Sequence, residues 1–217
     1  MTARKKKPRD DDTLKRAVVE AALVHAAFDG FTDRVLERAA SECGLDKAAT
    51  ARFFPVSAQS LVEAYSFQAD AEMEKRLARL HLPAMKVRER INAAITTRLG
   101  ILKPHKEAAR RAAAFLSLPP NLPLATKLLY RTVDSMWRAA GDTSTDFNFY
   151  TKRGILAGVY SATLIRWFND QSEDESATRD FLAARIENVM QFERFKGEAR
   201  KLFANLVEFG EKARGKK

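Results

Sequence analysis

Apolar residues recur at intervals of three and four along most of this chain, and convincing β-strand patterns are absent. The clearest run lies between residues 57 and 80 and comprises Leu61, Val62, Tyr65, Ala69, Met73, Leu77 and Leu80. Side chains at this spacing share one face of an α-helix, because the helix makes a turn about every 3.6 residues. The spacing therefore predicts an all-α fold.

Capping residues, glycines and prolines divide this pattern into about ten expected helices. Thr32 and Asp46 can cap helix N-termini, whereas Pro83, Pro104 and Pro123 mark later starts, because proline fits the first turn of a helix and breaks its interior. An acidic linker follows the eighth helix. The helices are expected near residues 13–30, 32–44, 46–54, 57–80, 84–102, 105–118, 122–140, 149–169, 176–195 and 197–213.

The composition is that of a globular protein. A chain of 217 residues, 46% apolar and 30% charged, can bury the core of one domain with an appended subdomain. Charges interrupt every apolar run before the roughly 20 residues of a membrane span, and the N-terminus lacks a signal-peptide pattern. Cys43, the only cysteine, excludes an internal disulfide and is expected in the core. We therefore expect a soluble, intracellular protein.

The formal net charge of +10 is concentrated at the two ends of the chain. The first nine residues carry five of these net positive charges and the last seven carry three, which leaves two for the rest. Basic tails on a nearly neutral body suit an anionic surface, either nucleic acid or phospholipid, or simply keep a protein in solution. The charge alone therefore does not assign a partner.

Residues 31–54, FTDRVLERAASECGLDKAATARFF, have the spacing of a helix-turn-helix. Together with the helices on either side, they resemble the N-terminal domain of TetR-type repressors. A DNA-binding role would need donors on the second helix, which offers Lys47, Thr50 and Arg52. However, residues 31–56 carry no net charge, so this segment lacks the basic surface that binds phosphates.

The phosphate-binding residues of such repressors are largely replaced in this chain. TetR-type repressors usually place a tyrosine and then a histidine near the end of the second helix, where this chain has Ala51 and Phe53. Their next helix usually opens with a lysine, whereas the matching helix here opens at Ser57. A retained fold without DNA binding is therefore favoured, and a ligand-responsive repressor is the alternative.

The helices between residues 84 and 190 are rich in apolar side chains. They could fill a solid core, which is the better interpretation of any single residue, or enclose an apolar ligand cavity between helices. Periodicity does not distinguish these two arrangements. The candidate lipid-binding residues are Leu99, Leu102, Phe115, Leu116, Leu129, Val133, Leu156, Val159, Tyr160, Leu164, Phe181, Ile186 and Met190.

No catalytic arrangement is visible in the sequence. His25, His81 and His105 lie apart from one another, and no Glu-x-x-His pair indicates a di-iron site. The chain also lacks a glycine-rich phosphate loop and a nucleophile elbow. We therefore predict a binding protein with no metal and no catalytic cofactor, rather than an enzyme.

The last expected helix has the pattern of a basic amphipathic helix, with five cations around an apolar stripe. Such a helix can lie in a membrane interface, or its stripe can pack on the bundle or on a second subunit. Its position beside a lysine-rich tail favours the membrane. The expected membrane-binding residues are Phe195, Leu202, Phe203, Leu206 and Val207.

Residues 141–153, GDTSTDFNFYTKR, are too rich in functional groups for an ordinary loop. Gly141 can end one helix, and residues 142–145 can cap the next. Capping does not explain the aromatic and polar residues that follow, which are Asp146, Phe147, Asn148, Phe149 and Tyr150. Such a mixture is typical of a protein-binding hot spot.

The surrounding segment VDSMWRAAGDTSTDFNFYTKRGILAGVYSATLIRW, residues 133–167, is similar to the signature of the ubiquinone-biosynthesis lipid-binding accessory family, found in mitochondria and in related bacteria. The resemblance extends over about residues 14–195. It implies a TetR-like fold repurposed away from nucleic acid, a homodimer, and a bound isoprenoid quinone or phospholipid. It also implies assistance to the di-iron hydroxylase of demethoxyubiquinone, at the cytoplasmic face of a bacterial inner membrane or the matrix face in a mitochondrion.

The resemblance also implies which residues the hydroxylase contacts and how the chain is organised. The implied contact residues are Asp134, Met136, Trp137, Asp146, Phe149 and Tyr150. At position 149 the family commonly has tryptophan, so phenylalanine keeps the apolar face and loses the indole donor. The expected organisation is a basic N-terminus at 1–12, a vestigial helix-turn-helix subdomain at 13–80, a lipid-binding bundle at 81–195, and an amphipathic helix with a tail at 196–217.

Overall fold

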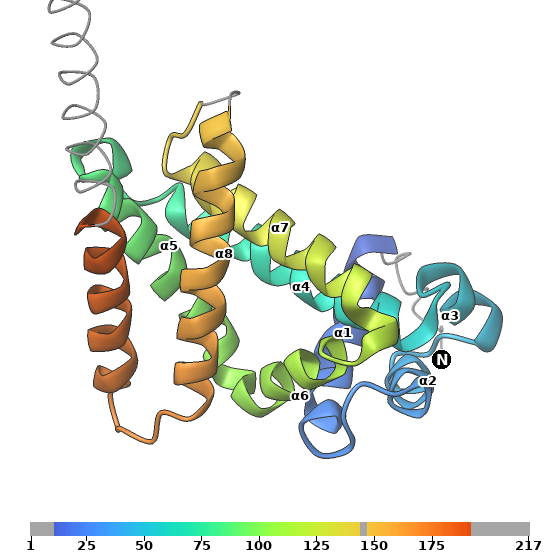
Figure 1. Cartoon of the computed structure of the whole chain (residues 1–217). Coiled ribbons are helices and arrows are strands. Elements are labelled where there is room, and N and C mark those ends of the chain that lie inside the picture. Colours follow the sequence, from blue (N-terminus) through green and yellow to red (C-terminus); the bar gives the residue numbers. More distant parts are fainter. Residues whose placement is uncertain (1–10, 144–146, 192–217) are drawn as a thin grey trace, which may run out of the picture. The chain divides into compact units, whose positions relative to one another are not determined.

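The computed structural model describes residues 11–143 and 147–191, and every regular element in these ranges is helical (Figure 1). The α-helices are α1 (Asp11–Asp29), α2 (Asp33–Glu42), α3 (Lys47–Phe53), α4 (Ser57–Leu77), α5 (Val87–Leu102), α6 (Lys106–Leu116), α7 (Leu122–Ala139) and α8 (Phe147–Phe168). A further helix begins at residue 176 and is described as far as residue 191. The all-α prediction is confirmed for these residues.

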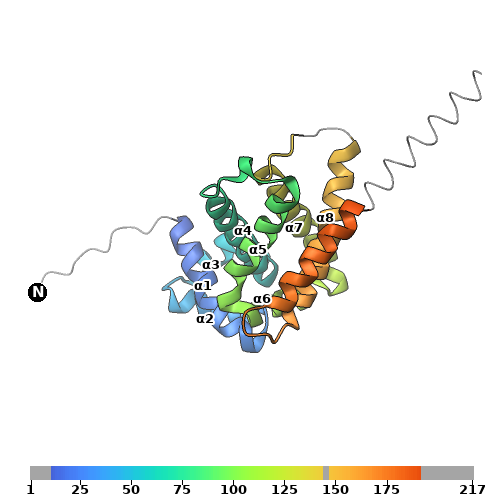
Figure 2. The ribbon, with the colours of Figure 1, turned by 90° about the vertical axis from the view of Figure 1, so that its left-hand side faces the viewer.

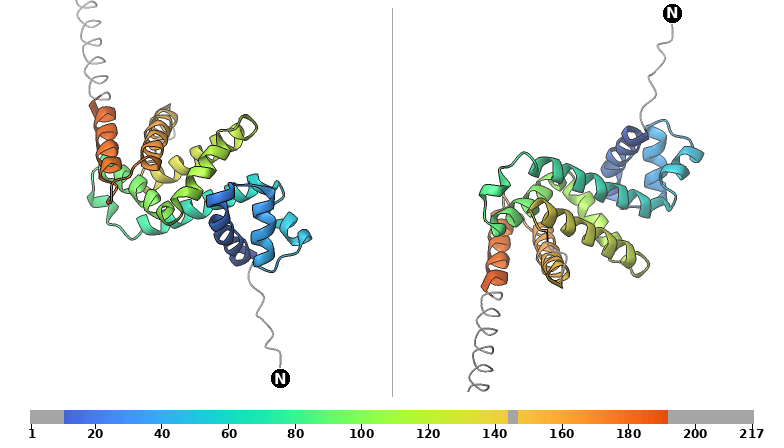
Figure 3. Two further views of the ribbon diagram at one scale, coloured as in Figure 1. Left: turned by 90° about the horizontal axis from the view of Figure 1, so that it is seen from below. Right: turned by 90° about the horizontal axis from the view of Figure 1, so that it is seen from above.

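The first three helices lie together at one end of the helical assembly that they form with α4 to α7 (Figures 2 and 3). The expected caps form here, because the Val35 amide donates to Thr32 Oγ1 at 3.2 Å and the Ala49 amide donates to Asp46 Oδ1 at 2.7 Å. Each side chain satisfies an amide that has no partner within its helix. Cys43, expected in the core, is only half-buried because it lies at the C-terminal end of α2.

Helices α5 and α6 begin slightly later than the sequence analysis expects from the positions of their prolines. Pro83 lies in the 3-10 helix η1 (Leu82–Ala84) and Pro104 in η2 (Lys103–His105), so α5 begins three residues later and α6 one residue later than expected. A third 3-10 helix, η3 (Pro119–Asn121), leads into α7. The fixed φ of proline suits a turn of 3-10 helix as well as a turn of α-helix. A proline therefore marks the region where a helix starts, but not the first residue of the α-helix.

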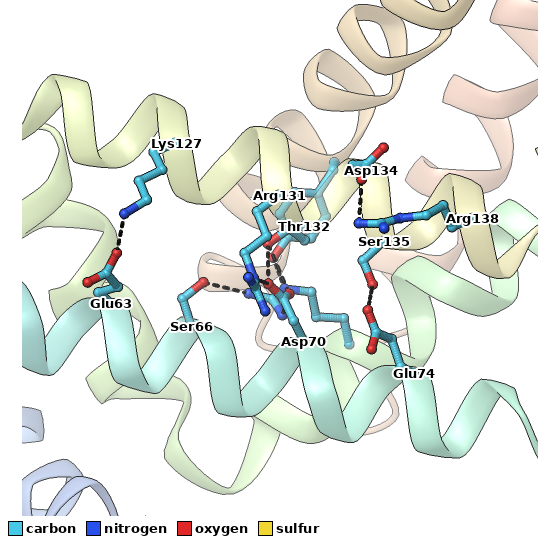
Figure 4. Close-up of polar contacts among 12 residues, drawn as sticks. Glu63, Ser66, Asp70, Glu74, Lys127, Arg131, Thr132, Asp134, Ser135 and Arg138 are labelled. Carbon is cyan, nitrogen blue, oxygen red and sulfur yellow. Dashed lines mark hydrogen bonds and ion pairs between the residues drawn. The ribbon is translucent and has the colours of Figure 1, made fainter. Parts of the chain in front are cut away.

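Helices α4 and α7 pack side by side and run in the same direction (Figure 1). Polar contacts join them at successive positions, with Glu63 to Lys127, Asp70 to Thr132 and Glu74 to Ser135 (Figure 4). Residue numbers on the two helices increase together along these contacts, which identifies the parallel orientation and fixes the register. Charged and hydroxyl side chains thus specify how α7 lies on α4.

By compactness the chain divides into two units, residues 1–160 and 161–217, and the division falls inside α8. In the second unit, a turn at residues 169–175 joins the end of α8 to the helix that begins at residue 176. Trp167 Nε1 donates to Glu175 Oε1 at 2.8 Å, and Asp170 Oδ2 accepts from the Thr178 amide at 2.7 Å. These bonds hold the turn. Among the described helices, none is both long enough and apolar enough to cross a membrane.

Candidate partner-binding site

The candidate site is formed where α7 ends and α8 begins. Gly141 adopts a φ of +85°, which L side chains rarely adopt, and its amide donates to the Arg138 carbonyl at 2.9 Å. The Asp142 amide reaches back to the Trp137 carbonyl at 3.0 Å. This pattern ends α7 and turns the chain toward α8, as the sequence predicted for Gly141. Residues 144–146 lie outside the described part of the chain.

Arg153, on the first turns of α8, binds two carboxylates at once. Its guanidinium forms ion pairs with Asp134 Oδ1 at 2.7 Å and with Asp142 Oδ2 at 3.1 Å. The side chains of Arg153, Asp134 and Asp142 are only 3%, 15% and 5% exposed. A planar guanidinium presents donors in several fixed directions, so one arginine can join α7, the turn and α8. We call this arrangement the Arg153 clamp.

Lys152 and Trp137 form a second link beside the clamp. The Lys152 ammonium pairs with Asp142 Oδ1 at 2.7 Å and lies 5.6 Å from the centre of the Trp137 ring. Trp137 Nε1 donates to the Lys152 carbonyl at 3.1 Å. The indole is therefore oriented by a hydrogen bond at one end and a cation at its face, which leaves it half-buried.

The two aromatic residues at the start of α8 differ in exposure. The Arg153 guanidinium carbon lies 3.4 Å from the centre of the Phe149 ring, so Phe149 is half-buried beneath the clamp. Tyr150 packs edge-on against Phe149, with the ring centres 5.2 Å apart, and remains 66% exposed. An exposed tyrosine held by a rigid neighbour is the kind of anchor that protein interfaces use.

Arg90 of α5 binds the C-terminal end of α7. Its guanidinium donates to the carbonyls of Ala140 at 2.8 Å, Met85 at 2.9 Å and Pro83 at 3.1 Å. The last carbonyls of a helix lack partners within it and carry partial negative charge, which a cation compensates. Arg90 therefore ties the end of α7 to the chain segment that leads into α5.

A buried ion pair stabilises the middle of α7. Asp70 of α4 pairs with Arg98 of α5, and Thr132 of α7 donates to Asp70 Oδ1 at 3.0 Å (Figure 4). Arg98 Nε also donates to the Tyr160 hydroxyl at 2.9 Å. Burial raises the pKa of Asp70, and the nearby Arg98, Thr132 and Arg131 act in the opposite direction. Four helices therefore meet at one polar centre.

The structure distributes the six predicted partner-binding residues unequally. Asp134, Trp137, Phe149 and Tyr150 gather around the Arg153 clamp, whereas Asp146 lies outside the described residues. Met136 is completely buried, so the expectation that its side chain contacts a partner is not met in this conformation. Met136 points to the core because α7 turns it about 100° from Trp137.

The sequence analysis did not assign three residues of the site, which are Asp142, Lys152 and Arg153. Asp142 was expected to cap α8, but its carboxylate binds Lys152 and Arg153 instead. Two adjacent cations one helical turn after an aromatic residue were a usable signal for Arg153, since a side chain at i+4 lies over residue i. Asp142 offered no comparable signal, because its partners depend on how the turn folds back.

The predicted lipid-binding residues are buried to different degrees. Leu99, Leu102, Val133, Leu156 and Tyr160 are buried, and the half-buried members are Phe115, Leu116, Leu129, Val159, Leu164, Phe181, Ile186 and Met190. A pocket of about 380 Å³ lies beside the C-terminal end of α4, where Leu77, Leu82 and Ser135 contribute to its wall. None of the predicted lipid-binding residues lines this pocket. The predicted membrane-binding residues, Phe195, Leu202, Phe203, Leu206 and Val207, lie outside the described part.

Two of the three DNA-binding candidates on α3 are engaged within the protein. The Thr50 hydroxyl is buried and donates to the Asp46 carbonyl at 2.7 Å. Arg52 pairs with Asp11 at 3.4 Å and lies 4.7 Å from the centre of the Phe53 ring. Lys47 is exposed. To bind a phosphate, Thr50 and Arg52 would have to give up these contacts.

The described residues also contain no group of three or more His, Cys, Asp and Glu side chains placed to hold a metal ion. Asp134, Asp142 and Asp70, the carboxylates at the centres described above, are bound by arginine or lysine side chains instead. The chemistry that this arrangement supports is recognition, through an exposed aromatic surface positioned by buried charges.

Comparison with known proteins identifies relatives across this region. Residues 122–193, which contain the whole Arg153 clamp, match the model of the COQ9 family. The chain is 35% identical over 187 residues to the ubiquinone biosynthesis protein COQ9, mitochondrial, of Rattus norvegicus, covering 83% of this chain and 60% of that protein. The Homo sapiens protein of the same name is 34% identical, with 83% and 58% covered. The chain thus spans about 60% of the relatives' length, and the resemblance seen in the sequence is confirmed.

The fold is confirmed by a solved structure. The crystal structure of the TetR transcriptional regulator from Nitrosomonas europaea ATCC 19718 superposes with a TM-score of 0.65, at 21% sequence identity. The superposition covers 80% of this chain and 96% of that chain. At this level of identity the likeness establishes a TetR-like fold and carries no conclusion about activity.

Proposed function

We propose that this chain, a relative of the COQ9 proteins over 83% of its length, is a non-enzymatic accessory protein of ubiquinone biosynthesis. In this proposal it binds an isoprenoid quinone or phospholipid and presents a quinone precursor to the di-iron hydroxylase of demethoxyubiquinone. The observation that carries the proposal is the match of residues 122–193 to the COQ9 family, together with the aromatic surface that the Arg153 clamp positions within that range.

The clamp supports a protein-binding role for this surface. Its three buried charges are mutually paired, and beside them Tyr150 is exposed while Trp137 and Phe149 are half-buried. Aromatic anchors held in place before binding lose little conformational entropy on association. We propose that Tyr150, exposed on 66% of its surface, is the central contact with the hydroxylase and that Trp137 flanks it.

The lipid ligand is proposed for the apolar helices beyond the site. Within the first unit, Phe115 and Leu116 of α6, Leu129 of α7 and Val159 of α8 are half-buried apolar residues of the kind on which an isoprenoid chain can pack. Membrane attachment is proposed for the amphipathic segment from Phe195 to Val207 together with the basic ends of the chain. In a bacterium this places the homodimer at the cytoplasmic face of the inner membrane, and in a mitochondrion at the matrix face, which is consistent with the mitochondrial relatives.

The contact surface can be tested by measuring the affinity of the purified protein for the di-iron hydroxylase. Tyr150→Ala should weaken binding by about 30-fold or more, because a central aromatic anchor contributes about 2 kcal/mol or more. Tyr130→Ala is the matched control, since Tyr130 is also exposed and lies on α7 outside the clamp. Equal affinities for the two variants would refute the assignment of Tyr150, provided that both retain the wild-type circular dichroism spectrum.

Lipid and membrane binding need separate measurements. Native mass spectrometry of the full chain should detect isoprenoid quinone or phospholipid that purifies with the protein, and a lipid-free protein would contradict the ligand assignment. Removal of residues 195–217 should abolish flotation with liposomes that contain anionic phospholipid. If the shortened protein still floats with the liposomes, the membrane contact lies elsewhere in the chain.

A further inference from the structure

The connection between α4 and α5 concentrates positive charge on one part of the surface. Residues 75–88, which we call the basic connection, carry five cations and no carboxylate. Residues 10–210 as a whole carry a net charge of only +2, so the rest of this range is net negative. The basic connection lies at the opposite end of α4 from α3 (Figures 1 and 3), and it is therefore distant from the helix-turn-helix.

Four of these cations are exposed and form no ion pair with another described residue. They are Lys75, Arg79, Lys86 and Arg88. The fifth, Arg76, pairs with Glu72 at 2.9 Å. Among the flanking carboxylates, Glu74 accepts from the Ser135 hydroxyl and Glu89 accepts from the Lys86 amide at 2.9 Å. With all three flanking carboxylates included, residues 72–90 still carry a net charge of +3.

Aliphatic side chains stand among these cations. Leu80 is 41% exposed and Val87 is 52% exposed. Pro83 and Ala84, which lie between them in η1, are also exposed. Leu82 alone within this stretch reaches the core, where it is 8% exposed. Apolar surface left in water costs free energy, which an apolar phase beside it would recover.

Arg90 holds the basic connection in place. Its guanidinium donates to the carbonyls of Met85 at 2.9 Å and Pro83 at 3.1 Å. It also donates to the Ala140 carbonyl at the end of α7, at 2.8 Å. The cations and aliphatic side chains are therefore presented on a fixed turn, and this turn is joined through α7 to the Arg153 clamp.

Cations interleaved with exposed aliphatic side chains suit the interface of an anionic bilayer. The apolar stems of lysine and arginine can lie along the apolar layer while their charged ends reach lipid phosphates. Nucleic acid offers no apolar phase for Leu80 and Val87, and the basic connection has no Phe, Tyr or Trp on which bases could stack. Protein interfaces are depleted of lysine at their centres. Lipid is therefore the partner that matches both kinds of side chain.

We propose that the basic connection lies on the surface of an anionic phospholipid bilayer, where Leu80 and Val87 enter the interface and Arg79, Lys86 and Arg88 bind lipid phosphates. This is a second membrane contact beside the one proposed for residues 195–207, and it rests on the function proposed above only in that the protein works at a bilayer. Because Arg90 joins it to the end of α7, the contact sets how the Arg153 clamp is oriented at the membrane.

Entry of the aliphatic side chains is tested with a fluorescent label in the full chain. In a Cys43→Ser background, which lacks cysteine, Val87→Cys carries a nitrobenzoxadiazole label, and a C-terminal histidine tag tethers the protein to vesicles through a nickel-chelating lipid. When the vesicles contain phosphatidylglycerol, the emission should shift to shorter wavelength and be quenched by nitroxide-bearing lipid. Val24→Cys is the matched control, because Val24 is 57% exposed on α1, and its label should keep the emission that it has in solution.

The role of charge is tested in the same tethered, Val87-labelled protein. R79Q/R88Q should lower the ratio of inserted to free label by about tenfold or more, because each cation near an anionic surface contributes to binding. R16Q/R34Q is the matched control, since it removes two exposed arginines from α1 and α2, and it should lower the ratio by about threefold or less. Vesicles of phosphatidylcholine alone should give no shift beyond that of the R79Q/R88Q variant.

Three results would overturn the proposal. The first is a label at position 87 that keeps its emission on tethered anionic vesicles. If its response depends on charge but nitroxide-bearing lipid does not quench it, the basic connection suits an anionic protein or nucleic acid instead. The second is an equal shift at positions 24 and 87, and the third is an equal loss in the two double variants, which would indicate general attraction to a basic protein. The tether supplies attachment, so failure of residues 195–217 to bind membranes, or of Tyr150 to bind the hydroxylase, would leave these measurements unaffected.

Discussion

Asp70 and Arg98 form an ion pair in the protein interior, where their side chains are only 1% and 6% exposed. The pair joins α4 to α5, and hydrogen bonds to Thr132 and Tyr160 extend it to α7 and α8. Charges withdrawn from water in this way are tolerated only when each has partners. The polar centre therefore constrains the relative positions of these helices and, through α7, the position of the Arg153 clamp.

Replacing one member of this pair should strongly destabilise the protein. Asp70→Asn leaves the Arg98 guanidinium buried without a counter-charge, and the free energy of unfolding should fall by about 3–5 kcal/mol. Urea denaturation followed by circular dichroism measures this change. Glu63→Gln is the matched control, because it breaks the α4–α7 pair with Lys127, whose side chain is 63% exposed, and should lose about 1 kcal/mol or less. Similar losses in the two variants would show that the buried pair has no special role.

Arg153 should not be replaceable by lysine. Lysine keeps the charge but carries all its donors on one nitrogen, whereas Arg153 uses Nε for Asp134 and Nη1 for Asp142, so Arg153→Lys should lower the free energy of unfolding by about 1–3 kcal/mol. Lys152→Gln serves as the comparison, because Lys152 is 39% exposed and its loss should cost about 1 kcal/mol or less. Thermal denaturation of both variants gives the ranking, and an unchanged melting temperature in Arg153→Lys would contradict the clamp.

Gly141 should be more sensitive to alanine than another glycine of similar backbone conformation. Gly141 and Gly44 have φ values of +85° and +77°, so both alanine variants should lose about 1 kcal/mol through backbone strain. Only at Gly141 would the new Cβ meet a neighbour, Arg90 Nη1 at 3.2 Å, which binds the Ala140 carbonyl. Chemical denaturation should therefore show a larger loss for Gly141→Ala, and equal losses would mean that Arg90 moves aside freely.

Asp170 should make the turn before the last described helix sensitive to acid. Hydrogen bonds from the Ser172 and Thr178 hydroxyls and from both residues' amides hold the pKa of Asp170 well below its usual range. A carboxyl with a lowered pKa stabilises the folded state above the unfolded pKa of about 3.9, and this stabilisation is lost as the pH falls from there through the folded pKa. Amide chemical shifts of Ser172 and Thr178, followed by NMR from pH 7 to pH 2, should therefore move only below about pH 4. Asp170→Asn should remove that transition, and a midpoint at or above pH 4 would contradict the assignment.

Much of the local structure could be predicted from the sequence because it depends on neighbouring residues. Thr32 and Asp46 cap α2 and α3 as expected, since a side chain and the amide three residues later are adjacent at any helix start. The helix from Ser57 to Leu77 follows from its apolar spacing. Ser57 begins this helix, and its hydroxyl donates to Asp33 at 2.5 Å.

The candidate site was predictable as a region but only partly as a set of contacts. The composition of residues 141–153 indicated a binding surface, and the resemblance indicated Trp137 and Tyr150. Both lie near the clamp, where Trp137 is half-buried and Tyr150 is exposed. Met136 is buried, although it directly precedes Trp137, since one helical position separates the core face from the surface. A sequence motif marks such a segment without resolving which of its side chains face outward.

The amino-acid sequence by itself determined the helical class, most helix boundaries and the family resemblance, because these depend on spacing and on motifs within short segments of chain. Only the tertiary structure decided that Asp142 binds Arg153, that Asp70 meets Arg98 across 28 positions, and that Tyr65 has a buried hydroxyl without a partner among the described residues. These relationships depend on how helices distant in sequence pack together. Burial and distance, which set the strength of charge pairs and hydrogen bonds, exist only once that packing has formed.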